Sequence, residues 1–222
     1  MAYQFDFGAQ SQYLGLLAGG TAVTLGLTAV ASVFGLSLAI GGAAATRSSQ
    51  AWLRGLVATY VELIRNTPFI VQMFFIFFGL PSLGLRFAAL PAAAIAMTIN
   101  LAAYAIEILR AGLDAVPAGQ SEAGRSLGLR PALVFGLLVL PQAVSVVYPA
   151  LVGQITITML ESAVVSQIAV VDLTHVADFI QSRNFRSFET YLIITLIYLA
   201  LAVVMRRLLA VGGRRLFAGR AR

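Results

Sequence analysis

Residues 14–45 read LGLLAGGTAVTLGLTAVASVFGLSLAIGGAAA and contain no charged side chain. Four further apolar stretches follow, at about residues 56–81, 88–112, 132–171 and 190–212. A hydrocarbon core about 30 Å thick needs around 20 apolar residues per helix, so each stretch is long enough to cross a bilayer. Because backbone polar groups in lipid must be satisfied within the protein, the pattern predicts an all-α integral membrane protein with about five transmembrane helices.

The composition of the chain also departs from that of a soluble protein. Of its 222 residues, 59% are hydrophobic and 11% are charged, whereas soluble domains average about 45–50% apolar and about 25% charged residues. We therefore expect one membrane domain over residues 1–222 and no separate soluble domain. The opening residues carry Asp6 and no base, which argues against a cleaved signal peptide.

The absence of two residue types limits the chemistry of the chain. There is no Cys, which excludes disulfides and thiolate metal sites. All 15 basic residues are Arg, and without Lys the chain cannot form a G-x-x-x-x-G-K-[ST] phosphate-binding loop. If ATP drives this protein, another chain hydrolyses it. We expect a protein that is not an enzyme and that holds no metal and no cofactor.

The arginines also predict an orientation. With the N-terminus outside, the loop at about residues 113–131 and the C-terminus are cytoplasmic, and the connection at about 172–189 is an outer loop. The net charge of +6 then indicates topology rather than nucleic-acid binding, since the arginines separate the apolar stretches instead of forming one soluble patch. The outer side holds only Arg86, Arg183 and Arg186, and the inner side holds Arg47, Arg54, Arg110, Arg125, Arg130, Arg206, Arg207, Arg214, Arg215, Arg220 and Arg222.

The fourth apolar stretch is too long for one simple span. It contains Pro141 and Pro149, and each proline removes a backbone donor and kinks or ends a helix. We expect a bent span there, followed by a broken or re-entrant segment.

The connection before this stretch runs from Gly112 to Pro141 and reads GLDAVPAGQSEAGRSLGLRPALVFGLLVLP. Its pattern predicts a short helix over residues 121–129 that ends near Arg130 and Pro131. Small side chains on such a helix allow close approach to a groove on a partner. By spacing alone, a loop helix without a special role is favoured over a docking helix.

The residues of this connection resemble a motif of known permeases. The permease subunits of binding-protein-dependent ABC importers carry E-A-A-x3-G-x9-I-x-L-P in a cytoplasmic loop. The chain departs from the motif at Gly124, which stands for the second Ala, and at Leu138, which stands for Ile. The matching positions at the same spacing are Glu122, Ala123, Gly128, Leu140 and Pro141.

Two further runs narrow the resemblance to the polar amino acid (histidine, glutamine and arginine) permease family. They are VELIRNTPFIVQMFFIFFGLP at residues 61–81 and AYAIEILRAGLDAVPAGQ at residues 103–120. The resemblance covers about residues 15–212 and implies the type I ABC importer transmembrane fold in the bacterial cytoplasmic (inner) membrane. It also implies a second permease chain, an extracytoplasmic amino-acid-binding protein, and a dimer of ATPase subunits that bind ATP and Mg. On this resemblance, Glu122, Ala123, Gly124 and Gly128 form a coupling helix that docks in the ATPase.

Three polar residues within the spans are candidates for the substrate pathway. Glu161 has no Arg within 20 residues on either side, so it needs a substrate ammonium group, a water-filled cavity or an Arg from another helix. Family members often have K-D-T-S-L at this place, where the chain has LESAV from Leu160. Asn100 faces either the pathway or an interhelical hydrogen bond. Tyr104 lies one turn before Glu107 and could face the same cavity.

The remaining charged residues favour structural roles. Glu62 and Arg65, like Glu107 and Arg110, are three residues apart on one helix face and are expected to form ion pairs. The lone His175 is expected to be solvated. Two other functions stay open: an ion-driven secondary transporter, which would usually show an internal repeat that we do not find, and a membrane scaffold that transports nothing.

Overall fold

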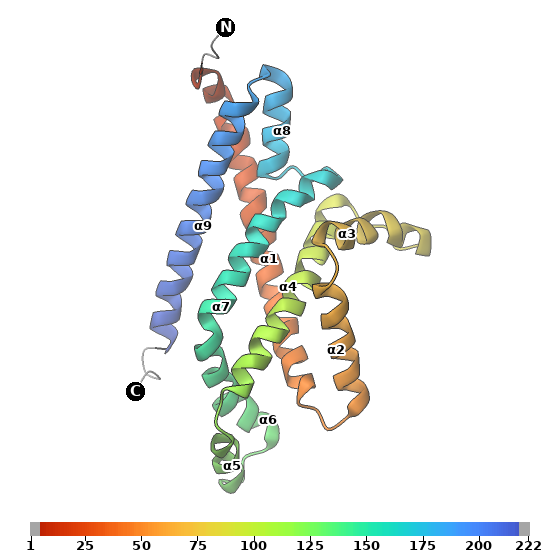
Figure 1. Cartoon of the computed structure of the whole chain (residues 1–222), viewed down its shortest axis with the longest axis vertical. Helices are drawn as coiled ribbons and strands as arrows, with labels where there is room; N and C mark the ends of the chain where they lie inside the picture. The colour runs from red at the N-terminus through yellow and green to blue at the C-terminus, as the bar shows by residue number, and fades with distance from the viewer. Residues whose placement is uncertain (1–4, 218–222) are drawn as a thin grey trace.

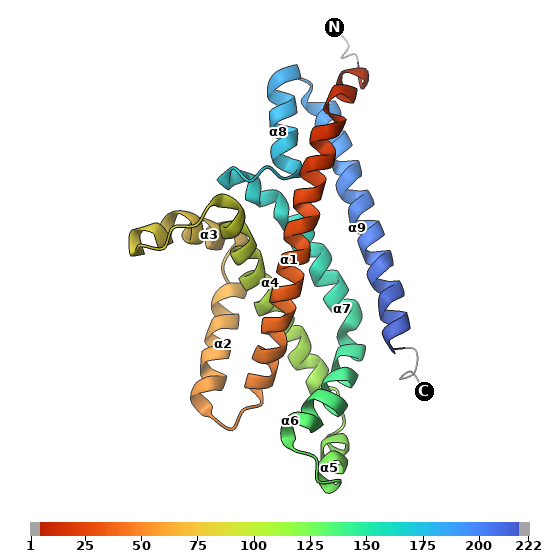
Figure 2. The same cartoon turned by 180° about the vertical axis from the view of Figure 1, so that it is seen from behind.

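The computed structural model describes residues 5–217, which leaves Arg220 and Arg222 of the predicted inner arginines outside the described residues. All regular secondary-structure elements of the described chain are helices (Figure 1). One end of the bundle carries the start of α1 together with α8, and the opposite end carries α5 and α6 (Figures 1 and 2). The elements are η1 (Gly8–Tyr13), α1 (Leu14–Thr46), α2 (Ala51–Arg65), α3 (Phe69–Phe74), η2 (Phe75–Gly79), η3 (Leu80–Leu83), α4 (Ala89–Asp114), α5 (Ala118–Ser126), α6 (Pro131–Leu133), η4 (Val134–Val139), α7 (Leu140–Glu161), η5 (Ser162–Ile168), α8 (Leu173–Asn184) and α9 (Ser187–Phe217).

The apolar stretches form the expected spans. Four long helical runs are apolar enough to cross a membrane, and α2 with the α3–η3 segment adds a fifth if this bent pair is one span. The two halves of the pair meet at an angle of 108°. Pro68 explains the break, because it lacks a backbone donor and disfavours helical geometry at Thr67 before it. The prediction of an all-α protein with about five spans is confirmed.

Helix α4 lies at the centre of the bundle and is the most buried of the four long spans, while α9 is the least buried. The closest helix packing joins α4 to α1. Small residues make it possible: a Cβ atom on Gly35 of α1 would lie 3.2 Å from Leu101 of α4, and one on Gly42 would collide with Ile106. A side chain at Gly42 would therefore require the Ile106 side chain to move.

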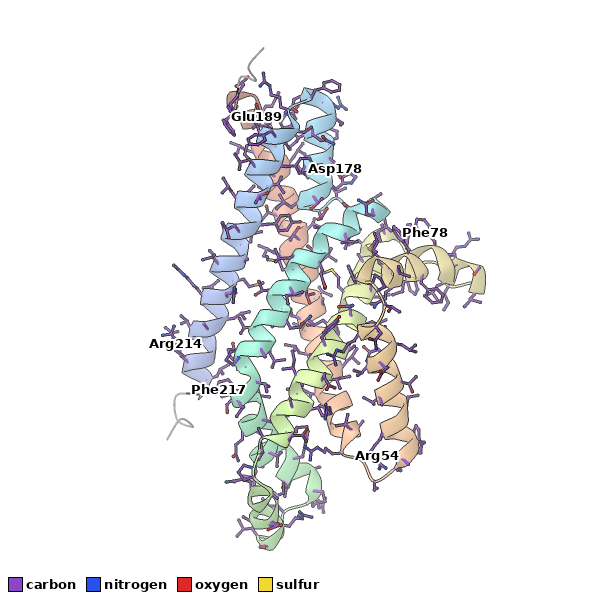
Figure 3. The ribbon with its side chains drawn as sticks, in the orientation of Figure 1. Arg54, Phe78, Asp178, Glu189, Arg214 and Phe217 are labelled. Carbon is purple, nitrogen blue, oxygen red and sulfur yellow. The ribbon has the colours of Figure 1, made fainter. Side chains whose placement is uncertain are left out.

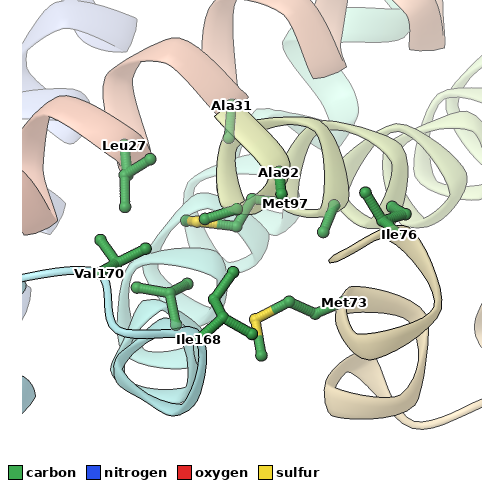
Figure 4. Close-up of a cluster of buried hydrophobic side chains, with 11 residues drawn as sticks. Leu27, Ala31, Met73, Ile76, Ala92, Met97, Ile168 and Val170 are labelled. Carbon is green, nitrogen blue, oxygen red and sulfur yellow. The ribbon is translucent and has the colours of Figure 1, made fainter. Parts of the chain in front are cut away.

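A second contact region joins α1, α3, α4 and η5. Leu27 and Ala31 of α1, Met73 of α3 and Met97 of α4 pack with Ile168 at the end of η5 (Figure 4). These side chains are buried, and Ala31 and Met73 have no exposed surface. The cluster holds the broken segment after α7 against the bent α2–α3 pair.

The fourth apolar stretch and the outer connection differ in detail from the predictions. The run from Pro131 to Ile168 is helical throughout, with a π-helical η4, Pro149 inside α7 and a 3-10 turn at η5. The outer connection contains a full helix, α8, that begins after Asp172. We predicted a loop because this segment is short and polar, but Asp172 caps α8 by accepting a hydrogen bond from the backbone of His175 at 2.9 Å.

Candidate functional site

The predicted short helix of this connection exists as α5, and it starts three residues earlier than predicted. It begins directly after Pro117, whose fixed backbone angle suits the start of a helix. It ends at Gly128, which adopts a left-handed backbone with φ of +76°. The Gly128 amide donates to the Arg125 carbonyl at 2.9 Å and the Leu129 amide donates to the Gly124 carbonyl at 3.2 Å. These two bonds form a Schellman cap, so this position requires a residue that tolerates positive φ.

The departure from the family motif at Gly124 has a packing cause. A Cβ atom on Gly124 would lie 2.8 Å from Leu138 and 3.0 Å from Val134, both in η4. Gly124 is buried against this element, whereas Glu122 and Ala123 are exposed on the other side of α5. The exposed face continues to Leu127, whose side chain is 79% exposed. One face of α5 therefore packs on the helix bundle. The other face, with Glu122, Ala123 and Leu127, is exposed and has no partner in the described chain.

An ionic chain joins the neighbouring helix ends. Arg47 after α1 forms a salt bridge with Asp114 at the end of α4, and Arg110 reaches the same carboxylate at 3.3 Å. Arg110 also pairs with Glu107, as predicted. A cavity of about 770 Å³ lies between this chain and α5, and Arg47, Asp114 and Arg125 line it. The ends of α1 and α4 are thus joined by salt bridges beside α5.

Side chains donate hydrogen bonds to the last carbonyl groups of α2, where the helix breaks. A helix that ends inside a membrane leaves carbonyl groups without intrahelical partners. Asn66 Nδ2 donates to the Glu62 carbonyl at 2.8 Å, and Thr67 Oγ1 donates to the Leu63 carbonyl at 2.8 Å. Gln72 of α3 reaches back and donates through Nε2 to the Ile64 carbonyl at 2.7 Å. The run from Asn66 to Gln72 therefore supplies the donors that the break requires.

Asn100 joins this arrangement from α4. Its Nδ2 atom donates to Gln72 Oε1 at 3.0 Å, so the interhelical hydrogen bond that we considered is present. The side chain is 3% exposed, and its Oδ1 atom is buried without a hydrogen-bond partner. A buried acceptor of this kind is rare, and a water molecule or a ligand commonly satisfies it. The hydrogen bond therefore uses the Nδ2 atom of Asn100 and leaves its Oδ1 atom without a partner.

Tyr104 lies one turn further along α4 and faces α2. The Arg65 guanidinium lies over its ring, 5.5 Å from the centroid. The predicted Glu62–Arg65 ion pair is wrong: within residues 5–217, no carboxylate lies within salt-bridge distance of Arg65. The physical reason is that a cation–π contact with a neighbouring helix positions Arg65 away from the residue on its own helix.

Glu161 is the last residue of α7 and is partly buried. No arginine of the described chain pairs with it, so the neighbouring-helix partner that we considered is not observed. No hydrogen bond joins Glu161 to Asn100 or Tyr104, which are all among the described residues. Of the three candidates, Asn100 and Tyr104 share one face of α4, and Glu161 stands apart on another span.

The comparisons with known proteins agree with this geometry. Residues 31–218 match the family model described as the binding-protein-dependent transport system inner membrane component. The chain belongs to this family. It is therefore a transport permease and not an enzyme.

Several relatives of the permease cover most of its length. The L-cystine transport system permease protein TcyB of Bacillus subtilis is 37% identical over 79% of this chain and 75% of its own. The arginine transport system permease protein ArtQ of Bacillus subtilis is 32% identical over 90% of this chain and 92% of its own. A crystal structure of an amino acid ABC transporter with histidines is 38% identical, with a TM-score of 0.86 over 96% of this chain and all of that one. The MetNI methionine ABC transporter, 22% identical with a TM-score of 0.74, shares the fold over 96% of this chain and 99% of its own.

Sequence reasoning missed one polar cluster of the permease, at the end opposite α5. Asp172 has no exposed surface, and it accepts a hydrogen bond from Tyr198 of α9 at 3.3 Å. The next amide, of Leu173, donates to Thr24 of α1 at 3.3 Å. Burial raises the pKa of the Asp172 carboxyl above its usual value. An Asp directly before the periodic apolar residues Leu173, Val176, Ala177 and Ile180 is an N-cap signal that could have identified α8.

Proposed function

We propose that this permease is the pathway subunit of an ATP-driven importer for polar amino acids. In this proposal two permease chains, identical or related, form the pathway, and two ATPase subunits dock on their α5 helices. The observation that carries the proposal is α5 itself, a capped helix at one end of the bundle with Glu122, Ala123 and Leu127 exposed. This surface is the docking site that we assign to the ATPase.

The packing of α5 explains how movement of the ATPase would reach the spans. Gly124 contacts η4, and η4 continues without a break into α7. On the other side, α4 runs directly into the connection before α5, and Gly112 packs so closely on α7 that a Cβ atom there would lie 2.8 Å from the Ala143 carbonyl. A tilt of α5 would therefore displace α4 and α7 together, as close-packed elements transmit strain. ATP and Mg belong to the ATPase subunits.

The substrate class rests on the relatives and on the polar residues of the spans. The relatives named above are permeases for cystine and arginine, and another of Bacillus subtilis, 36% identical over 79% of this chain and 83% of its own, is a probable glutamine ABC transporter permease. The free acceptor of Asn100 suits a donor such as water or a substrate ammonium group. Tyr104 and Glu161 are the other pathway residues that we propose. Glu161 would meet an ammonium group or a basic side chain.

The charge distribution supports an orientation with the N-terminus outside. Arg54 and Arg214 lie toward the α5 end of the molecule, and Asp178 and Glu189 lie toward the α8 end (Figure 3). The positive-inside rule then places α5 in the cytoplasm and α8 outside, in the bacterial inner membrane. In this orientation, a soluble amino-acid-binding protein would deliver substrate at the α8 end.

Co-purification tests the proposal. The tagged permease is extracted in detergent with its associated chains, alongside the variants Glu122→Arg and Gly128→Asp. We expect an ATPase subunit to accompany the parent chain and to be lost from both variants. The charge reversal Arg86→Glu, on an exposed residue before the opposite end of α4, serves as control and should retain the ATPase. A parent chain that binds no ATPase but still moves amino acids in vesicles would refute the proposal and favour an ion-driven transporter.

A further inference from the structure

A cavity of about 660 Å³ lies between α2 and α4. Two separate stretches of sequence meet there, one at the end of α2 and one in the second half of α4. Binding pockets for small molecules commonly have volumes of about 300–1,000 Å³, so the cavity is large enough for an amino acid. Its charged and polar lining residues are Thr46, Arg54, Glu62, Arg65, Asn66, Tyr104, Glu107 and Arg110.

The charges in this cavity are not all neutralised by one another. Glu107 and Arg110 form a salt bridge. In the described residues, by contrast, Arg65 lies over the ring of Tyr104 and interacts with the Glu107 carboxylate only beyond salt-bridge distance, and no cation forms a salt bridge with Glu62. The cavity therefore presents one guanidinium and one carboxylate that form no salt bridge.

These two charges lie within membrane-spanning segments. Arg65 ends α2 at the break of the bent pair, which is the middle of that span if the pair is one span. Tyr104, which Arg65 covers, lies about 15 Å along α4 from its end at Asp114, at a rise of 1.5 Å per residue. Charges at such positions are costly in lipid and normally face water, a partner or a ligand. Both Glu62 and Arg65 are exposed on the single chain, so the lipid-facing alternative is unfavourable.

We infer that the α2–α4 cavity binds the zwitterionic head of an amino acid, with Arg65 taking the carboxylate and Glu62 taking the ammonium group. Tyr104 positions Arg65 through the cation–π contact. Asn100, one turn before Tyr104 on α4, and Gln72 of α3 hydrogen-bond to each other beside the break, and neither of them lines the cavity. This site is distinct from Glu161, and it rests on the proposed function only in that the permease carries amino acids.

The absence of native cysteine makes a direct test possible. The exposed Ala58 lines the cavity, and Ala58→Cys introduces a single thiol there. The permease is purified with its ATPase, placed in nanodiscs and treated with a charged methanethiosulfonate reagent, and modification is followed by the mass of the permease chain. We expect modification at Ala58→Cys and protection by at least one of L-glutamine, L-arginine and L-cystine. Val33→Cys, at an exposed position of α1 away from the cavity, should show no protection.

Charge-deleted probes and variants then assign the two ends of the ligand. For whichever amino acid protects, its carboxamide and its N-acetyl derivative should protect at least tenfold less well. Arg65→Gln should abolish the preference for the acid over the amide, and Glu62→Gln should abolish the preference for the free amine over the acetylated form. Arg86→Gln is the matched control, because Arg86 is exposed and does not line the cavity, and it should change neither preference.

The outcomes separate this inference from the proposed function. If Ala58→Cys stays unmodified, or if none of the three amino acids protects it, the binding site is refuted while the ATPase still co-purifies. Equal protection by the acid, the amide and the acetylated form would also refute it. If the site behaves as expected but no ATPase accompanies the chain, the amino acid site stands and the ATP-driven importer fails.

Discussion

A series of substitutions at Gly128 can test whether the left-handed cap determines the stability of α5. The Gly128 φ of +76° lies in the left-handed region, where an ordinary residue costs roughly 1–2 kcal/mol and Asn costs less because its side chain bonds locally. No atom lies within 4 Å of a Cβ built at this position, so a substituted side chain meets no steric clash and the backbone angle alone decides the effect. Local stability of α5 should therefore fall in the order Gly, Asn, Ala and Val.

Hydrogen exchange measures this loss directly. A cost of about 1–2 kcal/mol corresponds to a factor of about 5–30 in the opening equilibrium. In Gly128→Ala, the amides of α5 should exchange faster by that factor, while those of α4 and α7 keep their rates. Gly128→Asn should fall between the parent and Gly128→Ala. Equal exchange in the Asn and Ala variants, or unchanged exchange in Ala, would refute the reasoning, because it would mean that the left-handed cap does not limit the stability of α5.

Three further perturbations test other parts of the site. Gln72→Leu leaves the buried Asn100 amide without a partner, at about 1–3 kcal/mol, and leaves the Ile64 carbonyl with only the 3.4 Å hydrogen bond from Thr67 Oγ1. It should lower the unfolding temperature in detergent, whereas Gln167→Leu, at an exposed position, should not. Glu161→Gln should reduce uptake by the assembled importer without loss of the bound ATPase, and unchanged uptake would remove Glu161 from the pathway. Burial raises the pKa of Asp172 above its usual 3.8, so its carboxyl takes up a proton more readily in the folded state than in the unfolded state. The unfolding temperature of the permease relative to that of Asp172→Asn should therefore rise as the pH falls from neutral toward 4. A difference that stays constant with pH would contradict this.

The fold was predictable from the sequence because lipid leaves a chain few choices. Apolar stretches of sufficient length must be helical, and their number set the number of spans. The motif residues were also identified, but their physical causes were not. Gly128 is needed for a left-handed cap and Gly124 for contact with η4, and neither cause can be inferred without knowing where α5 ends and what covers it.

The predictions failed where contacts between helices override those along one helix. Glu62 and Arg65 have the spacing of an ion pair, yet the position of Arg65 is set by Tyr104, which is 39 residues away in the chain. Gln72 was not recognised because its role depends on the break at Pro68, which brings it back to the end of α2. The charges of the α2–α4 cavity that form no salt bridge could therefore not be separated from paired ones by spacing alone.

The α9 side and the α2–α4 side of the bundle differ in the polarity of their exposed residues. α9 is the least buried long span, and its exposed side chains in the middle of the span, such as Leu196 and Leu199, are apolar and suit lipid. The break after α2 instead exposes Arg65, Asn66 and Thr67 within a candidate span. Lipid cannot solvate this second surface, whereas water or a second chain can. In the proposed pairing of two permeases, the second chain would enclose the α2–α4 side of the first.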